Sequence, residues 1–187
     1  MRDFANRTVM QDSSRQPQCR TFQKGLDFLA QNHDKDNWFL QIETFDPHEP
    51  FFCQPEYQQL FPDSYDGPFC DWPDYRPVNE EDSPEFITHL RHQYASVLKL
   101  CDENLGKVLD AMDHYNLWKD TMLIVNTDHG FLLSEHGQWA KCHCPFYGEV
   151  AHTPLFIWDP RSQKQNVRTS QLVQTIDLPA TLLEYFG

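Results

Sequence analysis

The chain has 187 residues, of which 40% are hydrophobic and 14% aromatic, and its formal net charge at pH 7 is -13. This length and apolar content suffice to bury a hydrophobic core, which excludes a disordered chain. The negative charge argues against nucleic acid or an anionic membrane as a partner, and no apolar run approaches the ~20 residues of a membrane span.

The first predicted elements lie before residue 50. Phe22, Leu26 and Leu29 have the spacing of a short amphipathic helix. Residues 37–45 ("NWFLQIETF") read as a strand buried on both faces, and this strand leads into the loop "DPHEPF". Residues 51–83 are rich in proline and aromatic side chains, which predicts a long irregular insertion.

The strongest local signal is a long helix that starts after Ser83. Ser83 is a good N-cap, Pro84 suits the first helical turn, and Asn116 is a plausible stop. Apolar side chains then recur at steps of three and four, which places them on one helical face. These are Phe86, Leu90, Tyr94, Val97, Cys101, Leu105, Val108 and Met112.

Two more apolar runs and a terminal helix complete the pattern. "TMLIVNT" (121–127) and "PLFIW" (154–158) each read as a buried strand, and "QTIDLPATLLEYFG" (174–187) reads as a short strand and then a helix from about Asp177. Continuous apolar strands separated by a helical segment indicate an α/β fold with a mainly parallel sheet flanked by helices.

Ionisable residues follow two of the predicted strands. In open α/β sheets, ligands bind outside the carboxyl ends of the strands. If the two strands are parallel neighbours, His48 of "DPHEP" and Asp128 and His129 of "TDHG" lie on the same rim. Gly130 permits a sharp turn, so the carboxylate and the imidazole can both face one divalent cation. The alternative is an Asp that caps a following helix beside a packed His.

Three further side chains are candidates for substrate contacts. Lys141 suits an anionic substrate oxygen, although a solvated surface Lys is the alternative. His48 stands between two prolines and can bond to a substrate oxygen or protonate a leaving group; a contact with a carbonyl is its alternative. His152 precedes a strand, so its ring points into the sheet or along the rim.

The six cysteines are at positions 19, 53, 70, 101, 142 and 144. A chain of this length and apolar content does not need a disulfide framework, so the sequence favours reduced thiols and, with them, a cytoplasmic setting. The triplet "CHC" at 142–144 resembles a metal clip, but without a second pair of ligands free thiols are the better interpretation.

In this order, the segments resemble the sulfatase family of the alkaline-phosphatase-like superfamily. The resemblance covers about residues 36–187 except 51–83, and its motifs are "NWFLQIETFDPHEPF", "YASVLKLCDENLGKVLDAMD", "LWKDTMLIVNTDHGFLLSEHGQWAK", "AHTPLFIWDP" and "QTIDLPATLLEYFG". It implies an alkaline-phosphatase-like α/β fold that is incomplete, with residues 1–187 forming the central to C-terminal part of one catalytic domain.

The resemblance also implies a role for each candidate. Asp128 and His129 fall on two ligands of a divalent metal, commonly calcium; many members have Asn at the second position, so manganese or zinc stays open. Lys141 falls on the Lys that contacts the sulfate and the nucleophile, and His48 on the His that contacts the sulfate or the leaving-group oxygen. His152 stands where many members have Arg.

The sequence departs from the family pattern because it lacks the motif of the catalytic nucleophile. The family nucleophile is a formylglycine made from Cys or Ser in a C/S-x-P/A-S/x-R motif, and none of the six cysteines has that context. The nucleophile and the early acidic metal ligands are therefore expected in a missing N-terminal part, and this chain alone is expected to be inactive.

The implied activity is metal-dependent hydrolysis of a sulfate ester, carried by a small molecule or a carbohydrate. The alternatives are a phosphatase, phosphonate monoester hydrolase or phosphotransferase of the same superfamily, or a non-catalytic binding domain that retains the fold. Within 51–83, four aromatic side chains suit either stacking on a sugar ring or core packing: Tyr65, Phe69, Trp72 and Tyr75. The oligomeric state stays open.

Overall fold

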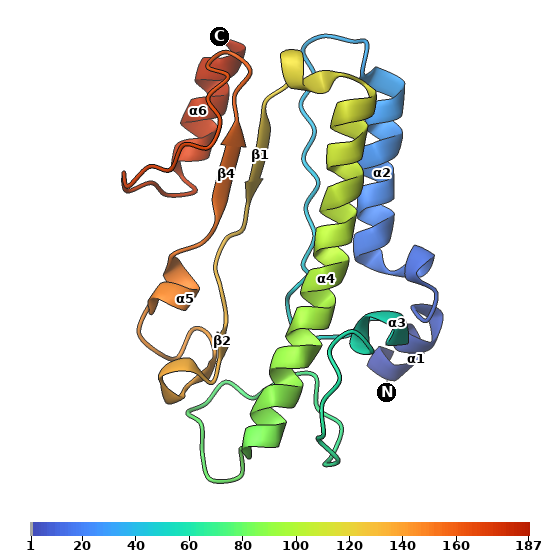
Figure 1. Cartoon of the computed structure of the whole chain (residues 1–187), viewed down its shortest axis with the longest axis vertical. Helices are drawn as coiled ribbons and strands as arrows, with labels where there is room; N and C mark the ends of the chain where they lie inside the picture. The colour runs from blue at the N-terminus through green and yellow to red at the C-terminus, as the bar shows by residue number, and fades with distance from the viewer. Residues whose placement is uncertain (1) are drawn as a thin grey trace.

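A computed structural model describes residues 2–187, with side chains described from Ala5 onward. The helices are α1 (Arg2–Val9), α2 (Pro17–Asn32), α3 (Pro55–Gln58), α4 (Pro84–His114), α5 (Gly148–Ala151) and α6 (Asp177–Phe186). The strands are β1 (Leu123–Asn126), β2 (Leu132–Leu133), β3 (Trp139–Ala140) and β4 (Leu155–Trp158). Figure 1 shows α2 and α4 side by side, with β1, β4 and α6 across from them.

Helix α4 confirms the sequence prediction closely. It runs for 31 residues, and the Ser83 side chain accepts a hydrogen bond from the backbone N–H of Phe86 at 3.2 Å. Its end coincides with the predicted stop, because Asn116 adopts a left-handed φ of 55° that a helix cannot continue through. The buried positions follow the predicted stripe and include Leu90, Val97, Val108 and Met112.

Helix α2 is longer than predicted and packs against α4. Leu29 of α2 joins Val108 and Met112 of α4 in one hydrophobic cluster. Gly25 lets the segment 38–45 approach the same helix: a Cβ at Gly25 would lie 2.3 Å from Cδ1 of Ile42. A side chain at this position would therefore push the segment away from the helix pair.

The prediction of a mainly parallel sheet is wrong for the residues that the structure describes. β1 pairs with β4 antiparallel, with Leu123 opposite Trp158, and β2 pairs with β3 antiparallel. A parallel pair needs a long crossover, usually a helix. The connection from β1 to β4 instead holds only the β2–β3 hairpin and the single turn of α5, so the chain doubles back.

The apolar run predicted as a strand at 37–45 forms no strand, although residues 38–45 have no helix or turn. Trp38, Leu40 and Ile42 pack on the cluster between α2 and α4, whereas Phe39 is 57% exposed and Phe45 90% exposed. Continuous hydrophobicity was the basis for predicting burial on both faces, and the structure buries only one. The short strand predicted near residue 174 is also absent, since residues 161–177 are all exposed and pair with no other segment.

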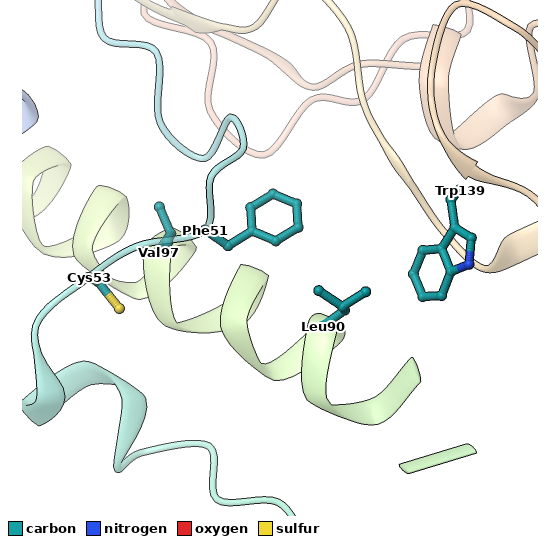
Figure 2. Close-up of a cluster of buried hydrophobic side chains, with 5 residues drawn as sticks. All are labelled: Phe51, Cys53, Leu90, Val97 and Trp139. Carbon is teal, nitrogen blue, oxygen red and sulfur yellow. The ribbon is translucent and has the colours of Figure 1, made fainter. Parts of the chain in front are cut away.

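A second hydrophobic cluster connects the irregular insertion with the β2–β3 hairpin. Phe51 and Cys53 come from the insertion, Leu90 and Val97 from α4, and Trp139 from β3 (Figure 2). Phe51 and Trp139 are fully buried. Their burial fixes two loops that are far apart in the sequence, and each loop carries one of the predicted site residues.

None of the helices within residues 2–187 combines the length and apolarity that crossing a bilayer requires.

Candidate active site

The β2–β3 hairpin brings Lys141 back beside the start of its own loop. Leu132 of β2 is opposite Ala140 of β3, so Phe131 and Lys141 are neighbours across the hairpin. The Lys141 ammonium lies 5.7 Å from the centroid of the Phe131 ring, within the range of a cation–π contact. Phe131 directly follows the "DHG" turn, so the predicted anion-binding and metal-binding residues stand at the two ends of one hairpin.

Lys141 is buried, with only 7% of its surface exposed, and is not the solvated surface Lys of the alternative interpretation. The backbone on both sides of it is unusual, since Ala140 has a φ of 67° and Cys142 a φ of 73°. A residue with a Cβ in this left-handed region costs about 1–2 kcal/mol. Such conformations persist only where the surrounding structure enforces them, here by the fully buried Trp139 and Ala140.

A buried carboxylate faces Lys141. Glu49 Oε2 lies 3.7 Å from Lys141 Nζ, and the Glu49 side chain is fully buried. The Tyr75 hydroxyl donates a hydrogen bond to Glu49 Oε1. Burial, and after it the contact with the Glu49 carboxylate, raises the pKa of Tyr75 well above its usual value, so this phenol stays protonated as a donor.

His48 adjoins the same carboxylate. Its Nδ1 lies 2.7 Å from the backbone oxygen of Glu49 and 3.3 Å from Glu49 Oε2. Because a carbonyl can only accept, Nδ1 carries a proton, and this contact does not involve Nε2. The carbonyl contact of the alternative interpretation is thus present, and it leaves Nε2 available. We call His48, Glu49, Tyr75 and Lys141 the Glu49 cluster.

Asp128 and His129, which we call the DH pair, are far more open to solvent. The Asp128 side chain is 82% exposed and that of His129 is 40% exposed, and His129 Nε2 lies 3.5 Å from Asp128 Oδ2. Burial acts to raise the pKa of Asp128, but the hydrogen bond from the His129 backbone N–H and the nearby ring outweigh it, so the pKa lies below its usual value.

Helix α5 fixes the turn that follows the DH pair. The backbone N–H of Gly130 donates to the carbonyl of Val150 at 2.8 Å. A Cβ at Gly130 would lie 1.8 Å from the backbone oxygen of Glu149, so only glycine allows this approach. His152 ends α5, its backbone N–H donates to the carbonyl of Gly148 at 2.8 Å, and its surface is exposed.

The donor set of the DH pair fits two positions around a divalent cation, one oxygen and one nitrogen. No group of three or more His, Cys, Asp or Glu side chains within the described residues is arranged to hold a metal. The "CHC" triplet does not form a clip either: all six cysteines are free thiols, and His143 Nδ1 lies 3.1 Å from the carbonyl oxygen of Lys141.

Sequence reasoning missed Glu49, which turns out to contact both Lys141 and His48. The available signal was its place beside His48 in a loop bracketed by prolines.

Of the four aromatic side chains proposed for stacking, Trp72 is 53% exposed and Phe69 is 63% exposed. Tyr75 instead bonds to Glu49, and Tyr65 packs against Phe86 and His89.

A family model described as Sulfatase matches residues 3–187, nearly the whole chain. The chain therefore belongs to the sulfatase family, whose alkaline-phosphatase-like fold is of the α/β class. This confirms the family resemblance drawn from the ordered motifs.

Individual relatives agree with the family model. The uncharacterized sulfatase YidJ of Escherichia coli is 26% identical over 176 residues, which are 88% of this chain and 35% of the relative. Human iduronate 2-sulfatase is 26% identical over 148 residues, 66% of this chain and 26% of the relative. An N-acetylglucosamine-6-O-sulfatase of Bacteroides thetaiotaomicron is 30% identical over 103 residues, 55% of this chain and 18% of the relative. The chain thus spans about a third or less of these relatives.

Proposed function

We propose that this chain supplies part of the active site of a metal-dependent sulfuric ester hydrolase. The observation that carries the proposal is the burial of Lys141 at one end of the hairpin that begins with the DH pair. An acidic protein that repels anions overall needs local cations to bind one. The sulfatase family match and the names of the relatives support sulfate as that anion.

Each side chain has a distinct task in this proposal. The positive charge of Lys141 offsets the negative charge that builds up on the sulfuryl oxygens in the transition state. His48, with Nδ1 held by the Glu49 carbonyl, presents Nε2 to the departing alcohol oxygen; when the ring carries a second proton, Nε2 donates it to that oxygen. His152 is a further candidate for contact with the substrate, since it is exposed at the end of α5.

A divalent ion, commonly calcium in this family, would be held by Asp128 and His129 together with ligands from elsewhere in the protein. When bound, it adds positive charge that stabilises the sulfuryl oxygens. The nucleophile is proposed to be a formylglycine from a part of the protein outside this sequence. The curated relatives, being longer, leave room for both contributions.

The proposed substrate class is a sulfate ester of a small molecule or a carbohydrate. Relatives with printed substrates include the iduronate and N-acetylglucosamine sulfatases and a choline-sulfatase of Rhizobium meliloti, 24% identical over 161 residues. Trp72, which is 53% exposed, is proposed as a side chain that stacks on a sugar ring.

The test is hydrolysis of 4-methylumbelliferyl sulfate and the matching phosphate by the chain expressed with its flanking coding sequence, with and without added calcium. We expect faster cleavage of the sulfate, and a loss of at least about 100-fold in Lys141→Met, the scale for removing one charge-stabilising group. Lys164→Met, at an exposed position, is the control.

Other outcomes separate the alternatives. Faster cleavage of the phosphate would identify a phosphoryl-transfer enzyme of the same superfamily, a possibility that His129 in place of Asn keeps open. If neither ester is cleaved and calcium titration shows no binding, the enzyme proposal fails and a binding domain that retains the fold is the better description.

A further inference from the structure

The proposed reaction gives no task to the carboxylate of Glu49, although it lies at the centre of the Glu49 cluster. Glu49 is a carboxylate with 4% of its surface exposed, in a site that is proposed to bind an anion. A negative charge beside an anion site weakens anion binding, and a buried charge is unfavourable unless it is paired. Its position next to Lys141 therefore calls for a physical explanation.

Glu49 contacts every polar group of the cluster. Oε1 accepts the hydrogen bond from Tyr75, and Oε2 lies 3.7 Å from Lys141 Nζ and 3.3 Å from His48 Nδ1. Oε2 is buried and accepts no hydrogen bond from the described residues. The Lys141 contact is thus an ion pair without a hydrogen bond, close enough to hold the ammonium and loose enough to leave its N–H groups free for another acceptor.

The pair is flanked by fully buried residues. Phe51 follows Glu49 by two residues and Trp139 precedes Lys141 by two, and both are fully buried in the cluster of Figure 2. Two more titratable groups adjoin Tyr75: the Cys142 thiolate would raise its pKa, and the His143 ring centroid is 6.4 Å from that of Tyr75. Glu49 is the carboxylate that directly contacts Lys141.

We infer that Glu49 is a positioning residue for Lys141: it holds the ammonium group beside Phe131 and balances its charge until an anionic substrate group binds. This inference rests on the proposed function for the identity of that anion. When the anion binds, Lys141 donates its free N–H groups to it. When the product leaves, the Glu49 carboxylate holds the Lys141 ammonium in the same position.

The test compares variants of the full chain by titration with inorganic sulfate and by thermal unfolding. Glu49→Gln keeps the shape and removes the charge, so we expect sulfate to bind about tenfold more tightly once the repulsion between two like charges is gone. Glu49→Ala leaves Lys141 unsupported and should weaken binding. A Glu49 with only a structural role would make both variants bind sulfate equally well or both bind it worse.

The control is Glu103→Gln. Glu103 also accepts a hydrogen bond from a tyrosine, Tyr57 at 2.8 Å, but its ion pair is with Lys99 on the surface of α4. This variant should bind sulfate as the unmodified chain does.

Thermal unfolding tests the pair without reference to sulfate. Glu49→Gln and Lys141→Met should each lower the unfolding temperature, and the double variant, which leaves neither charge buried, should unfold at a higher temperature than Lys141→Met alone. Purely additive effects would overturn the inference. If no form binds sulfate while the two substitutions stay coupled, the ion pair stands and the proposed sulfate site fails instead.

Discussion

The Glu49 cluster and the DH pair sit at the two ends of one hairpin but are built on opposite principles. In the cluster, the Lys141 and Glu49 side chains are 9% and 0% exposed and each has a partner of opposite charge. In the DH pair, Asp128 is 82% exposed and its contacts are local. Folding of this chain therefore buries and pairs the first group, whereas it leaves the second open to solvent.

The difference follows from the sequence neighbours of each group. Phe51 and Trp139 connect the Glu49 cluster to the hydrophobic core. The burial of their apolar side chains stabilises the geometry of the Glu49 cluster. The DH pair follows the exposed end of β1, and α5 contacts the turn after the pair through the hydrogen bond from Gly130 to Val150. Substitutions in the cluster should consequently change stability, and substitutions in the DH pair should mainly change metal binding.

The largest expected effect is that of Lys141→Met. Removing the ammonium leaves Glu49 buried without its cation, which typically costs about 3–5 kcal/mol. Unfolding by urea, followed by tryptophan fluorescence, measures the loss. Asp128→Asn, at an exposed position, should change the free energy of unfolding by less than about 0.5 kcal/mol. If both variants lost the same unfolding free energy, the Glu49 cluster and the DH pair would not differ in their contribution to stability.

The next effect is that of Gly130→Ala. A Cβ here would overlap the backbone oxygen of Glu149, so α5 has to move and we expect a loss of about 3 kcal/mol. The matched control is Gly106→Ala in α4, where an added Cβ meets nothing within 4 Å. That variant should gain about 0.5–1 kcal/mol, because alanine is the better helix former. Chemical denaturation of both variants gives the comparison.

A smaller effect concerns the loss of stability in acid that Asp82, a hydrogen-bond partner of Trp139, is expected to cause. Hydrogen bonds from the Arg76 guanidinium lower the pKa of Asp82 from 3.8 to about 2, and Asp82 also accepts from the Trp139 indole at 3.1 Å. The folded state has the lower pKa, so this contribution is complete above about pH 4 and is lost as the pH falls through 2. About 2 kcal/mol of unfolding free energy should disappear across that window.

The variant Asp82→Asn provides the check on this acid transition. It should be less stable than the unmodified chain at pH 7 and should show a flatter dependence of the unfolding free energy on pH between 4 and 2. If the two proteins lose stability in parallel on acidification, another carboxylate is responsible.

The smallest effect is that of Cys142→Gly. Glycine adopts the φ of 73° without strain but adds flexibility to the unfolded chain, so the net change should be a gain below about 1 kcal/mol. The control, Cys144→Gly, replaces a residue whose φ is not positive and should lose stability by a similar amount. Differential scanning calorimetry of the two variants shows whether the first gains stability and the second loses it.

Local signals predicted the longest helix well, whereas two of the predicted strands, at 37–45 and near residue 174, are absent. Helix α4 has its cap at Ser83, its first residue at Pro84 and its stop near Asn116, because capping and helical periodicity act over a few residues. The sequence also predicted β1, β4 and the start of α6 near Asp177. The pairing of the strands could not be predicted in this way, since it depends on how the chain between β1 and β4 turns.

The contents of the Glu49 cluster illustrate the same limit. The resemblance of the motifs to a family pointed to Lys141 and His48, whereas the signal for Glu49 among the 28 acidic residues of the chain was limited to its place beside His48 between two prolines. What buries it is the packing of Phe51 and Trp139 from distant segments into one core. The roles of His152 and of the DH pair stay predictions, to be tested by the binding and hydrolysis experiments.

The two-stranded sheet of β1 and β4 has a practical consequence for handling the protein. Within the residues that the structure describes, β1 pairs with β4 alone, and the neighbouring Phe156 is 67% exposed. Such an edge can pair with another copy, and a net charge of -13 opposes this by mutual repulsion. Salt shortens the range of that repulsion to about 10 Å at 0.1 M. Low ionic strength should therefore keep concentrated solutions clear, and added salt should promote precipitation.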